Sequence, residues 1–239
     1  MGDIIEFDKT IVPACDVETL EQLKRVVYAT REFPGVVAYK LGFVMGYSFG
    51  LPAAVGTIKD AYSEAVVIFD HQKACTDVPF TGEKFAKLMD DCEVDAAILF
   101  PRENDAVTQY AWTDELLERK IGVIVGGELT SRPATPDIER IYDNAVLQGV
   151  TNFVVPGNKP ERVEHYRKRF EDFGIEADLF APGFVSQGGD ISEAGQVAGE
   201  RWHAICGRAV YNPNKKNLDD VTEEEINESV AQLVSSLGD

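Results

Sequence analysis

A short charged stretch holds residues whose types and spacing could do chemistry. The apolar run 65–69 ends abruptly at Asp70, and Lys73 then lies between that carboxylate and Asp77. A cation held between two anions can deliver a proton or stabilise a charge that develops on a substrate. A surface cluster of ion pairs would show the same pattern, because structural ion pairs also bring such charges together. The rest of the chain has to distinguish these two interpretations.

Eight apolar segments recur at fairly even spacing, and each precedes a segment with helical periodicity. In the first such segment, Leu20, Leu23 and Val26 have the spacing of an amphipathic helix, and Asp16 is expected to cap its start. We expect strands near residues 10–16, 36–41, 65–69, 94–100, 121–127, 150–155, 177–181 and 202–208. We expect helices near 17–27, 52–62, 82–91, 105–118, 136–148, 160–173 and 222–237, with a short one after 190.

Eight strand–helix units without a linker or a break in composition predict one (β/α)8 (TIM) barrel domain over residues 1–239. An open, doubly wound sheet is the alternative. Such sheets more often have five to seven strands, and no GxGxxG motif follows the first strand. The barrel is therefore the favoured fold.

Composition excludes several classes of function. The net charge of −18 disfavours nucleic acid and anionic membranes as partners. No apolar run is long enough to cross a bilayer, and the acidic N-terminus does not resemble a signal peptide. The four cysteines are widely spaced and form no CxxC pair, so neither a zinc site nor a disulfide framework is indicated. We expect a cytoplasmic protein.

In a (β/α)8 barrel, functional groups stand at the carboxyl ends of the strands and in the loops beyond them. Polar or charged residues follow six of the eight expected strands: Asp16, Lys40, Asp70 with Lys73 and Asp77, Glu128 with Thr130, Gln187, and Arg208. A solvated surface would scatter such residues along the helices as well. Their convergence on one face therefore favours a site.

The loops after the seventh and eighth strands usually form the phosphate site of such a barrel. Here they contain Gln187-Gly188-Gly189 and Cys206-Gly207-Arg208. Glycines let backbone N–H groups approach an anion closely, and arginine can bind phosphate through two hydrogen bonds. A tight turn without a ligand is the alternative for the two glycines.

Together these motifs resemble the orotidine 5′-phosphate decarboxylase family, within the superfamily of ribulose-phosphate-binding barrels. The resemblance covers nearly the whole chain. Its most specific parts are Tyr39-Lys40-Leu41-Gly42, the Asp70/Lys73/Asp77 array with Pro79 and Thr81, and the segments 154–162, 182–190 and 207–212. It implies conversion of orotidine 5′-monophosphate (OMP) to UMP and CO2 in de novo pyrimidine synthesis. It also implies a homodimer that needs no metal or organic cofactor.

The resemblance implies a role for each matching residue. Lys73 would protonate C6 of the ring as a carbanion forms there, and Lys40 and Asp70 would complete the charged network, with Asp70 close to the substrate carboxylate. Asp77 and Thr81 would reach across the dimer into the partner's site, Thr81 at the ribose.

The remaining implied roles are in substrate binding. Asp16 and Lys40 would bind the ribose hydroxyls, and Thr130 the pyrimidine edge. Gln187 and Arg208 would bind the phosphate, and Pro182, Gly188 and Gly207 would complete the same loops.

The spacing of the array departs from the family pattern. The family has Asp-x-Lys-x-x-Asp, whereas this chain has Asp70-x-x-Lys73-x-x-x-Asp77. In an extended strand, residues two apart share a face and residues three apart do not, so the backbone has to bulge or turn before Lys73. His71, two residues before Lys73, is the alternative to Asp70 as the first member. The loop 128–133 is also one residue longer than expected, so Thr130 and Ser131 compete for the pyrimidine contact.

Two rival functions remain open. The first is an Mg²⁺-dependent sugar-phosphate decarboxylase or aldolase of the same superfamily. Those enzymes usually carry an acid where this chain has Lys40, and a lysine would repel the metal. The second is a barrel that binds nucleotides without catalysis, which the presence of Lys73 disfavours.

Overall fold

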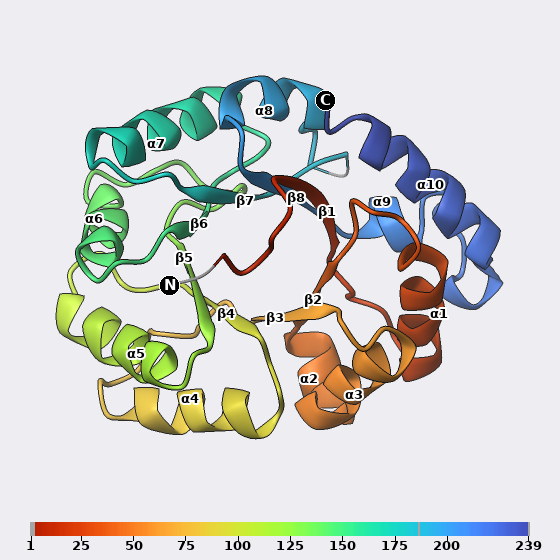
Figure 1. The fold of residues 1–239 in the computed structure, drawn as a ribbon, viewed down its shortest axis with the longest axis horizontal. Helices are drawn as coiled ribbons and strands as arrows, with labels where there is room; N and C mark the ends of the chain where they lie inside the picture. Colours follow the sequence, from red (N-terminus) through yellow and green to blue (C-terminus); the bar gives the residue numbers. More distant parts are fainter. Residues whose placement is uncertain (1–2, 186, 239) are drawn as a thin grey trace.

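The computed structural model describes residues 3–185 and 187–238, and it shows the predicted (β/α)8 barrel, with parallel strands inside a ring of helices (Figure 1). The strands are β1 (Lys9–Pro13), β2 (Ala38–Gly42), β3 (Val66–Asp70), β4 (Ala96–Leu99), β5 (Gly122–Gly126), β6 (Asn152–Val154), β7 (Asp178–Pro182) and β8 (Trp202–Cys206). The helices are α1 (Leu20–Thr30), α2 (Phe43–Phe49), α3 (Leu51–Ala61), α4 (Thr81–Asp91), α5 (Ala106–Glu118), α6 (Glu139–Leu147), α7 (Pro160–Asp172), α8 (Ile191–Ala198), α9 (Arg208–Tyr211) and α10 (Glu223–Ser235), with a 3-10 turn η1 (Leu218–Asp220).

The strands form one parallel sheet in the order β1-β8-β7-β6-β5-β4-β3-β2. The circle closes between β1 and β2 through a bridge that joins Ala14 to Lys40. There the Cys15 N–H donates to the Lys40 carbonyl oxygen at 2.8 Å. The closing bridge thus lies at the carboxyl ends of both strands, beside two of the predicted site positions.

Alternation along each strand separates two apolar cores. One face of the strands fills the interior of the barrel with side chains such as Val12, Ile68 and Ile98. The other face packs against the helices, with side chains such as Ile11 and Phe69. Because residues two apart share a face, a polar residue two positions beyond an interior residue points into the mouth of the barrel. This rule positions the site.

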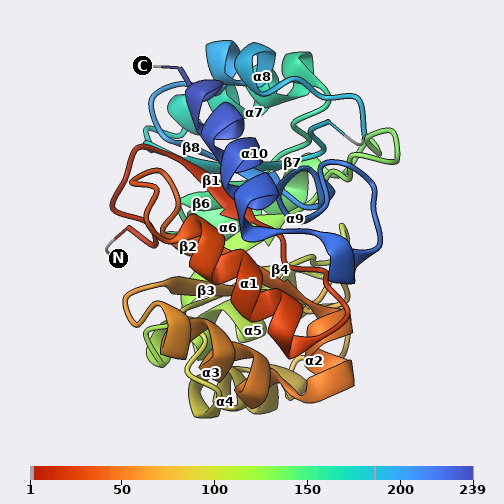
Figure 2. The same cartoon turned by 90° about the vertical axis from the view of Figure 1, so that its right-hand side faces the viewer.

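The helices form an outer layer, in which several successive helices contact one another and the first and last helices are also in contact. Figure 2 shows α1 and α10 packed side by side, so the last helix covers the first. Among the described residues, no helix is long and apolar enough to span a membrane.

The connection from β2 to α3 contains a helix that the expected elements, a strand at 36–41 and a helix at 52–62, do not include. The chain forms α2 immediately after β2, and Gly46 of this helix faces the Phe69 ring. The segment contains three aromatic residues and lacks a polar face, so its periodicity does not indicate a helix. The expected cap at Asp16 is also wrong, because Thr19 caps α1 by accepting from the Gln22 N–H. Asp16 is thereby left free for another role.

Candidate active site

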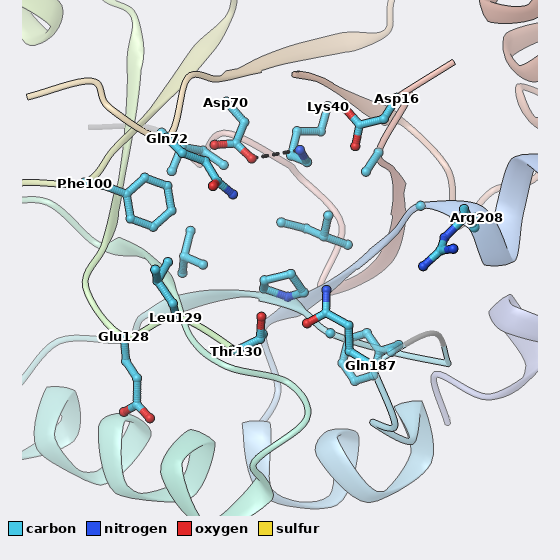
Figure 3. Close-up of a pocket in the computed structure, with 18 of the residues that line it drawn as sticks. Asp16, Lys40, Asp70, Gln72, Phe100, Glu128, Leu129, Thr130, Gln187 and Arg208 are labelled. Carbon is cyan, nitrogen blue, oxygen red and sulfur yellow. Dashed lines mark hydrogen bonds and ion pairs between the residues drawn. The ribbon is translucent and has the colours of Figure 1, made fainter. Parts of the chain in front are cut away.

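A pocket of about 270 Å³ opens at the carboxyl ends of the strands (Figure 3). Its polar lining comes from strand ends, loops and α9, which are far apart in the sequence: Asp16, Lys40, Asp70, Gln72, Glu128, Thr130, Gln187, Arg208 and Tyr211. Its apolar lining includes Ile98, Phe100, Leu129, Val154, Pro182, Phe184 and Ile205. The pocket therefore has the position and the mixed lining of a barrel active site.

Lys40 and Asp70 form a buried ion pair on the pocket wall. Lys40 is two residues beyond Ala38, and Asp70 is two residues beyond Ile68, so both side chains follow interior positions of neighbouring strands. Lys40 Nζ donates to Asp70 Oδ2 at 2.8 Å, and the two side chains are only 9% and 10% exposed. Burial alone would lower the pKa of Lys40, but attraction by Asp70 and Asp16 outweighs it, so the pKa is raised. Lys40 is thus held as a cation.

The second carboxylate oxygen of the pair has no partner. Asp70 Oδ1 is buried, and within residues 3–185 and 187–238 nothing donates a hydrogen bond to it. An unpaired buried oxygen is costly, so its presence in a pocket indicates a place for a further donor.

Gln72, and not Lys73, lines the pocket next to Asp70. The extra residue in this segment shifts the lysine by one position, so Gln72 is the residue two beyond Asp70. Lys73 is exposed outside the pocket lining, and its side chain has no partner in the described part of the chain. The structure therefore does not pair Lys73 with Asp70, whose carboxylate bonds to Lys40 instead.

The backbone around Lys73 is held by polar contacts. The His71 ring bonds through Nε2 to the Tyr47 hydroxyl at 2.7 Å, and its Nδ1 accepts from the Lys73 N–H at 3.3 Å. The Phe100 N–H donates to the Ala74 carbonyl oxygen at 3.1 Å. Cys75 has a left-handed φ of 69°, which turns the chain away from the strand direction. His71 itself lies outside the pocket lining.

The two residues expected to serve a partner's site also lie outside the pocket. Asp77 is exposed, and its carboxylate accepts from the Val78 N–H at 2.8 Å. Thr81 begins α4 and donates its hydroxyl proton to the Val78 carbonyl oxygen. Phe80, between them, is 70% exposed, and Val78 is 43% exposed.

Asp16 reaches the pocket because Gly42 has no side chain. A Cβ atom on Gly42 would lie only 2.4 Å from Asp16 Oδ1. The glycine that follows Tyr39-Lys40-Leu41 thus makes room for a carboxylate from the neighbouring strand end. Asp16 is exposed at the mouth, on the same side of the pocket as Lys40 (Figure 3).

Glu128 borders the pocket but points its carboxylate away from it (Figure 3). The carboxylate accepts from Lys159 Nζ at 2.9 Å, Arg162 Nε at 2.7 Å and the Tyr166 hydroxyl at 2.8 Å. Burial would raise the pKa of Glu128, but these three donors lower it. Lys159 also donates to the Leu129 carbonyl oxygen at 3.1 Å. This cluster therefore anchors the loop that follows β5.

That anchored loop places Thr130 in the pocket and leaves Ser131 outside it, exposed. Asn158 Nδ2 donates to the Thr130 carbonyl oxygen at 3.3 Å. Gly183, with a φ of 109°, faces the Thr130 methyl group so closely that a Cβ atom would lie 2.8 Å from it. The loops after β5, β6 and β7 are thus in contact at Thr130.

The expected phosphate end lies across the pocket from Asp70. Gln187, Gly207 and Arg208 line this end, and Pro182 also lines the pocket, whereas Gly188 lies outside the lining and has a φ of 84°. Arg208 is exposed, and its guanidinium has no partner among the described residues. Its donors are therefore free for an anion.

Tyr211 joins Arg208 in the pocket because α9 places residues three apart on one face. Burial, followed by the nearby Asp16 carboxylate, raises the pKa of its hydroxyl, which is therefore neutral and can donate. Sequence reasoning missed Tyr211, Gln72 and Phe100. The spacings Arg208-x-x-Tyr211 and Asp70-x-Gln72 were the available signals.

The chain is a (β/α)8 barrel with a charged pocket at the carboxyl ends of its strands. No protein-family model matches the chain. In sequence it is similar to the orotidine 5′-phosphate decarboxylase of Methanococcus maripaludis strain C6, with 26% identity over 207 residues, 84% of this chain and 91% of the relative. The same enzyme of Methanocaldococcus jannaschii is 24% identical over 210 residues, 85% of this chain and 92% of the relative.

Solved structures agree with the fold. Orotidine 5′-monophosphate decarboxylase from M. jannaschii, in complex with the inhibitor BMP, has a TM-score of 0.79 at 22% identity, covering 97% of this chain and 99% of that one. The enzyme from Pyrococcus horikoshii OT3 has a TM-score of 0.73 at 19% identity, covering 95% and 99%. The comparisons confirm the resemblance to the orotidine 5′-phosphate decarboxylase family.

Proposed function

We propose that this chain decarboxylates OMP to UMP, a cytoplasmic step of de novo pyrimidine synthesis. One observation carries the proposal. The same pocket holds a buried Lys40–Asp70 pair with a free carboxylate oxygen at one end and the unpaired Arg208 guanidinium at the other. A nucleotide has its phosphate and its base at opposite ends, so it matches this arrangement.

The free donors set the direction of the ligand. Arg208 binds the phosphate with Gln187 and the Gly207 backbone, since guanidinium and backbone N–H groups suit a dianion. The ribose then lies by Asp16 and Lys40, whose charged groups accept from and donate to its hydroxyls. The base extends to Asp70 and Thr130.

The bond to be broken is the one between C6 and its carboxylate carbon. Its electron pair stays on C6 while CO2 leaves, and the carbanion is stabilised by fixed positive charge. Lys73 then gives a proton to C6 and becomes a neutral amine. Asp70 repels the substrate carboxylate, and that repulsion eases as CO2 departs. Binding energy from the phosphate contacts keeps the substrate carboxylate next to Asp70 despite this repulsion.

Lys73 has to move for this step, since its exposed side chain lies outside the pocket lining. Its long, flexible stem and free ammonium allow such a movement. We infer that Lys73 turns inward when the nucleotide binds and donates to Asp70 Oδ1. The unpaired buried oxygen supports this inference.

The active unit is a homodimer in this proposal. Asp77 and Thr81 lie outside the lining of their own pocket, on a segment that also exposes Val78 and Phe80. Two exposed apolar side chains between two polar ones suit a contact with a second copy. Each copy would then supply Asp77 and Thr81 to the other's site.

The test is the loss of OMP absorbance with purified protein in EDTA. We expect one UMP and one CO2 to form for each OMP consumed, without added metal. Turnover of a sugar phosphate only with Mg²⁺ would establish the rival enzyme. Tight UMP binding without any OMP turnover would establish the non-catalytic barrel.

A further inference from the structure

Gln72 separates the main pocket from a second hollow. Gln72, Phe100 and Leu129 border both cavities. The hollow lies beyond them, over Pro101–Asp105 and the first turn of α6 with the residue before it. Two of the three dividing side chains are apolar, so the carboxamide of Gln72 is the polar group of this partition.

The carboxamide is available to a ligand. Gln72 is exposed, and in the described part of the chain no protein group bonds to its side chain. A glutamine side chain offers two N–H donors and one acceptor oxygen. Asp70, which lines the same pocket two residues earlier in the chain, has an unpaired oxygen and can only accept while it is charged. A ligand carboxylate beside Asp70 therefore needs a donor from another side chain.

The proposed orientation brings the ring carboxylate to this partition. Figure 3 shows Gln72 on the same side of the pocket as Asp70 and Phe100, with Gln187 and Arg208 on the other. With the phosphate at Arg208 and the amide edge of the base at Thr130, the opposite edge of the ring faces Asp70 and Gln72. That edge carries the carboxylate that the reaction removes.

We propose that Gln72 is a specificity-determining residue that donates from Nε2 to the ring carboxylate of the nucleotide. It thereby selects the carboxylated substrate over the product, which has hydrogen at that carbon. This inference rests on the proposed function. Two observations support this role: Gln72 lies on the same side of the pocket as Asp70, and it borders both cavities.

The experiment compares the two nucleotides with matched variants. Gln72→Leu keeps the approximate size and removes the donor, whereas Gln72→Glu replaces the donor by a negative charge. Gln232→Glu makes the same charge change on the exposed face of α10, far from the pocket. For each protein, KM and kcat are measured with OMP, and Kd with UMP by calorimetry.

Gln72→Leu is expected to raise the KM for OMP between tenfold and a hundredfold, roughly the range of a hydrogen bond to a charged group. Gln72→Glu is expected to raise it further, because it adds repulsion. The Kd for UMP should stay within about twofold of wild type in both variants, and Gln232→Glu should change neither constant. Equal weakening of OMP and UMP would mean that Gln72 only shapes the pocket and would overturn the proposal, as would unchanged constants.

A binding measurement tests the role of Gln72 independently of the proposed function. OMP and UMP are titrated into the Lys73→Ala variant, with and without Gln72→Leu, so that OMP is not consumed. Loss of the preference for OMP supports the role of Gln72 even if wild type shows no turnover. Turnover by wild type together with an unchanged preference would refute the role of Gln72 and leave the proposed function intact.

Discussion

Lys40 Nζ lies 2.8 Å from Asp70 Oδ2, and this buried contact joins the carboxyl ends of two neighbouring strands. Each residue follows an interior barrel position by two, so the pleat of the strands aims both side chains at one point. The pair brings a fixed cation and a fixed anion into one wall of the pocket. Catalysis without an electron sink depends on such fixed charges.

Breaking this pair should destabilise the fold. Lys40→Met leaves the Asp70 carboxylate buried without its cation, which costs about 3–5 kcal/mol. The free energy of unfolding, measured by urea titration at neutral pH, should fall by that amount. The double variant Lys40→Met/Asp70→Leu replaces both charges by apolar groups and should recover most of the stability but none of the activity. A loss below about 1 kcal/mol in the single variant would show that the pair is not buried in solution.

Gly42→Ala should impair substrate binding more than folding. The new Cβ atom would lie 2.4 Å from Asp16 Oδ1, so the carboxylate has to move out of its place. We expect the KM for OMP to rise about tenfold, as for the loss of one hydrogen bond. Gly56→Ala in α3 is the control, because nothing lies within 4 Å of its Cβ position. It should leave KM unchanged and raise stability by about 0.5–1 kcal/mol. Equal KM values for the two variants would contradict the role of Asp16.

Arg208→Ala should reduce kcat/KM for OMP about a thousandfold, or ~4 kcal/mol. The guanidinium is free and aimed at the proposed phosphate. Orotidine, which lacks the phosphate, is the discriminating substrate, since its low rate should be the same for wild type and variant. Arg140→Ala, which removes an exposed arginine on α6, is the matched control. A similar loss with both substrates would assign Arg208 to the fold and not to phosphate binding.

His203 should make the barrel sensitive to acid. It is fully buried in β8, where its Nδ1 bonds to the Thr10 hydroxyl at 2.9 Å, and burial followed by the nearby Arg201 lowers its pKa from 6.5 to about 3. The unfolded chain therefore takes up the proton first. The contribution of this group to the free energy of unfolding is complete above pH 6.5 and is lost as the pH falls towards 3, by roughly 5 kcal/mol in all.

The measurement is the free energy of unfolding at pH 7 and pH 4 for wild type and His203→Leu. Subtracting the pH-dependent change in the free energy of unfolding of the variant from that of wild type gives the contribution of the histidine without that of the carboxylates. Asp178, close to His203, has its pKa raised by burial and acts in the opposite direction. We expect a smaller loss between the two pH values in the variant. An identical loss would mean that His203 does not set the acid limit.

Much of the fold could be predicted because buried parallel strands are nearly continuous apolar runs. The segments 65–69 and 121–127 correspond closely to β3 and β5. Helix α2 was not predicted, because its sequence has no polar face and Gly46 is typical of a turn. The cap at Thr19 was misplaced at Asp16, since both residue types cap helices and only the backbone distinguishes them.

The candidate site was predictable where a strand end fixes the side chain. Asp16, Lys40 and Asp70 line the pocket as the alternation requires. Lys73 follows no such rule, because the segment after Asp70 turns, and its direction depends on contacts such as that between Phe100 and Ala74. Sequence spacing showed that the array was altered but could not show that Gln72 takes the pocket position.

The most direct test of the central claim is kcat/KM for OMP in EDTA, compared among wild type, Lys73→Ala and Lys84→Ala. Lys84 is an exposed lysine on α4, so its variant controls for loss of one surface charge. A general acid typically contributes 10²–10⁴-fold. The account predicts a loss of about that size or more for Lys73→Ala, with an unchanged melting temperature, and no loss for Lys84→Ala. Wild-type activity in Lys73→Ala would contradict it.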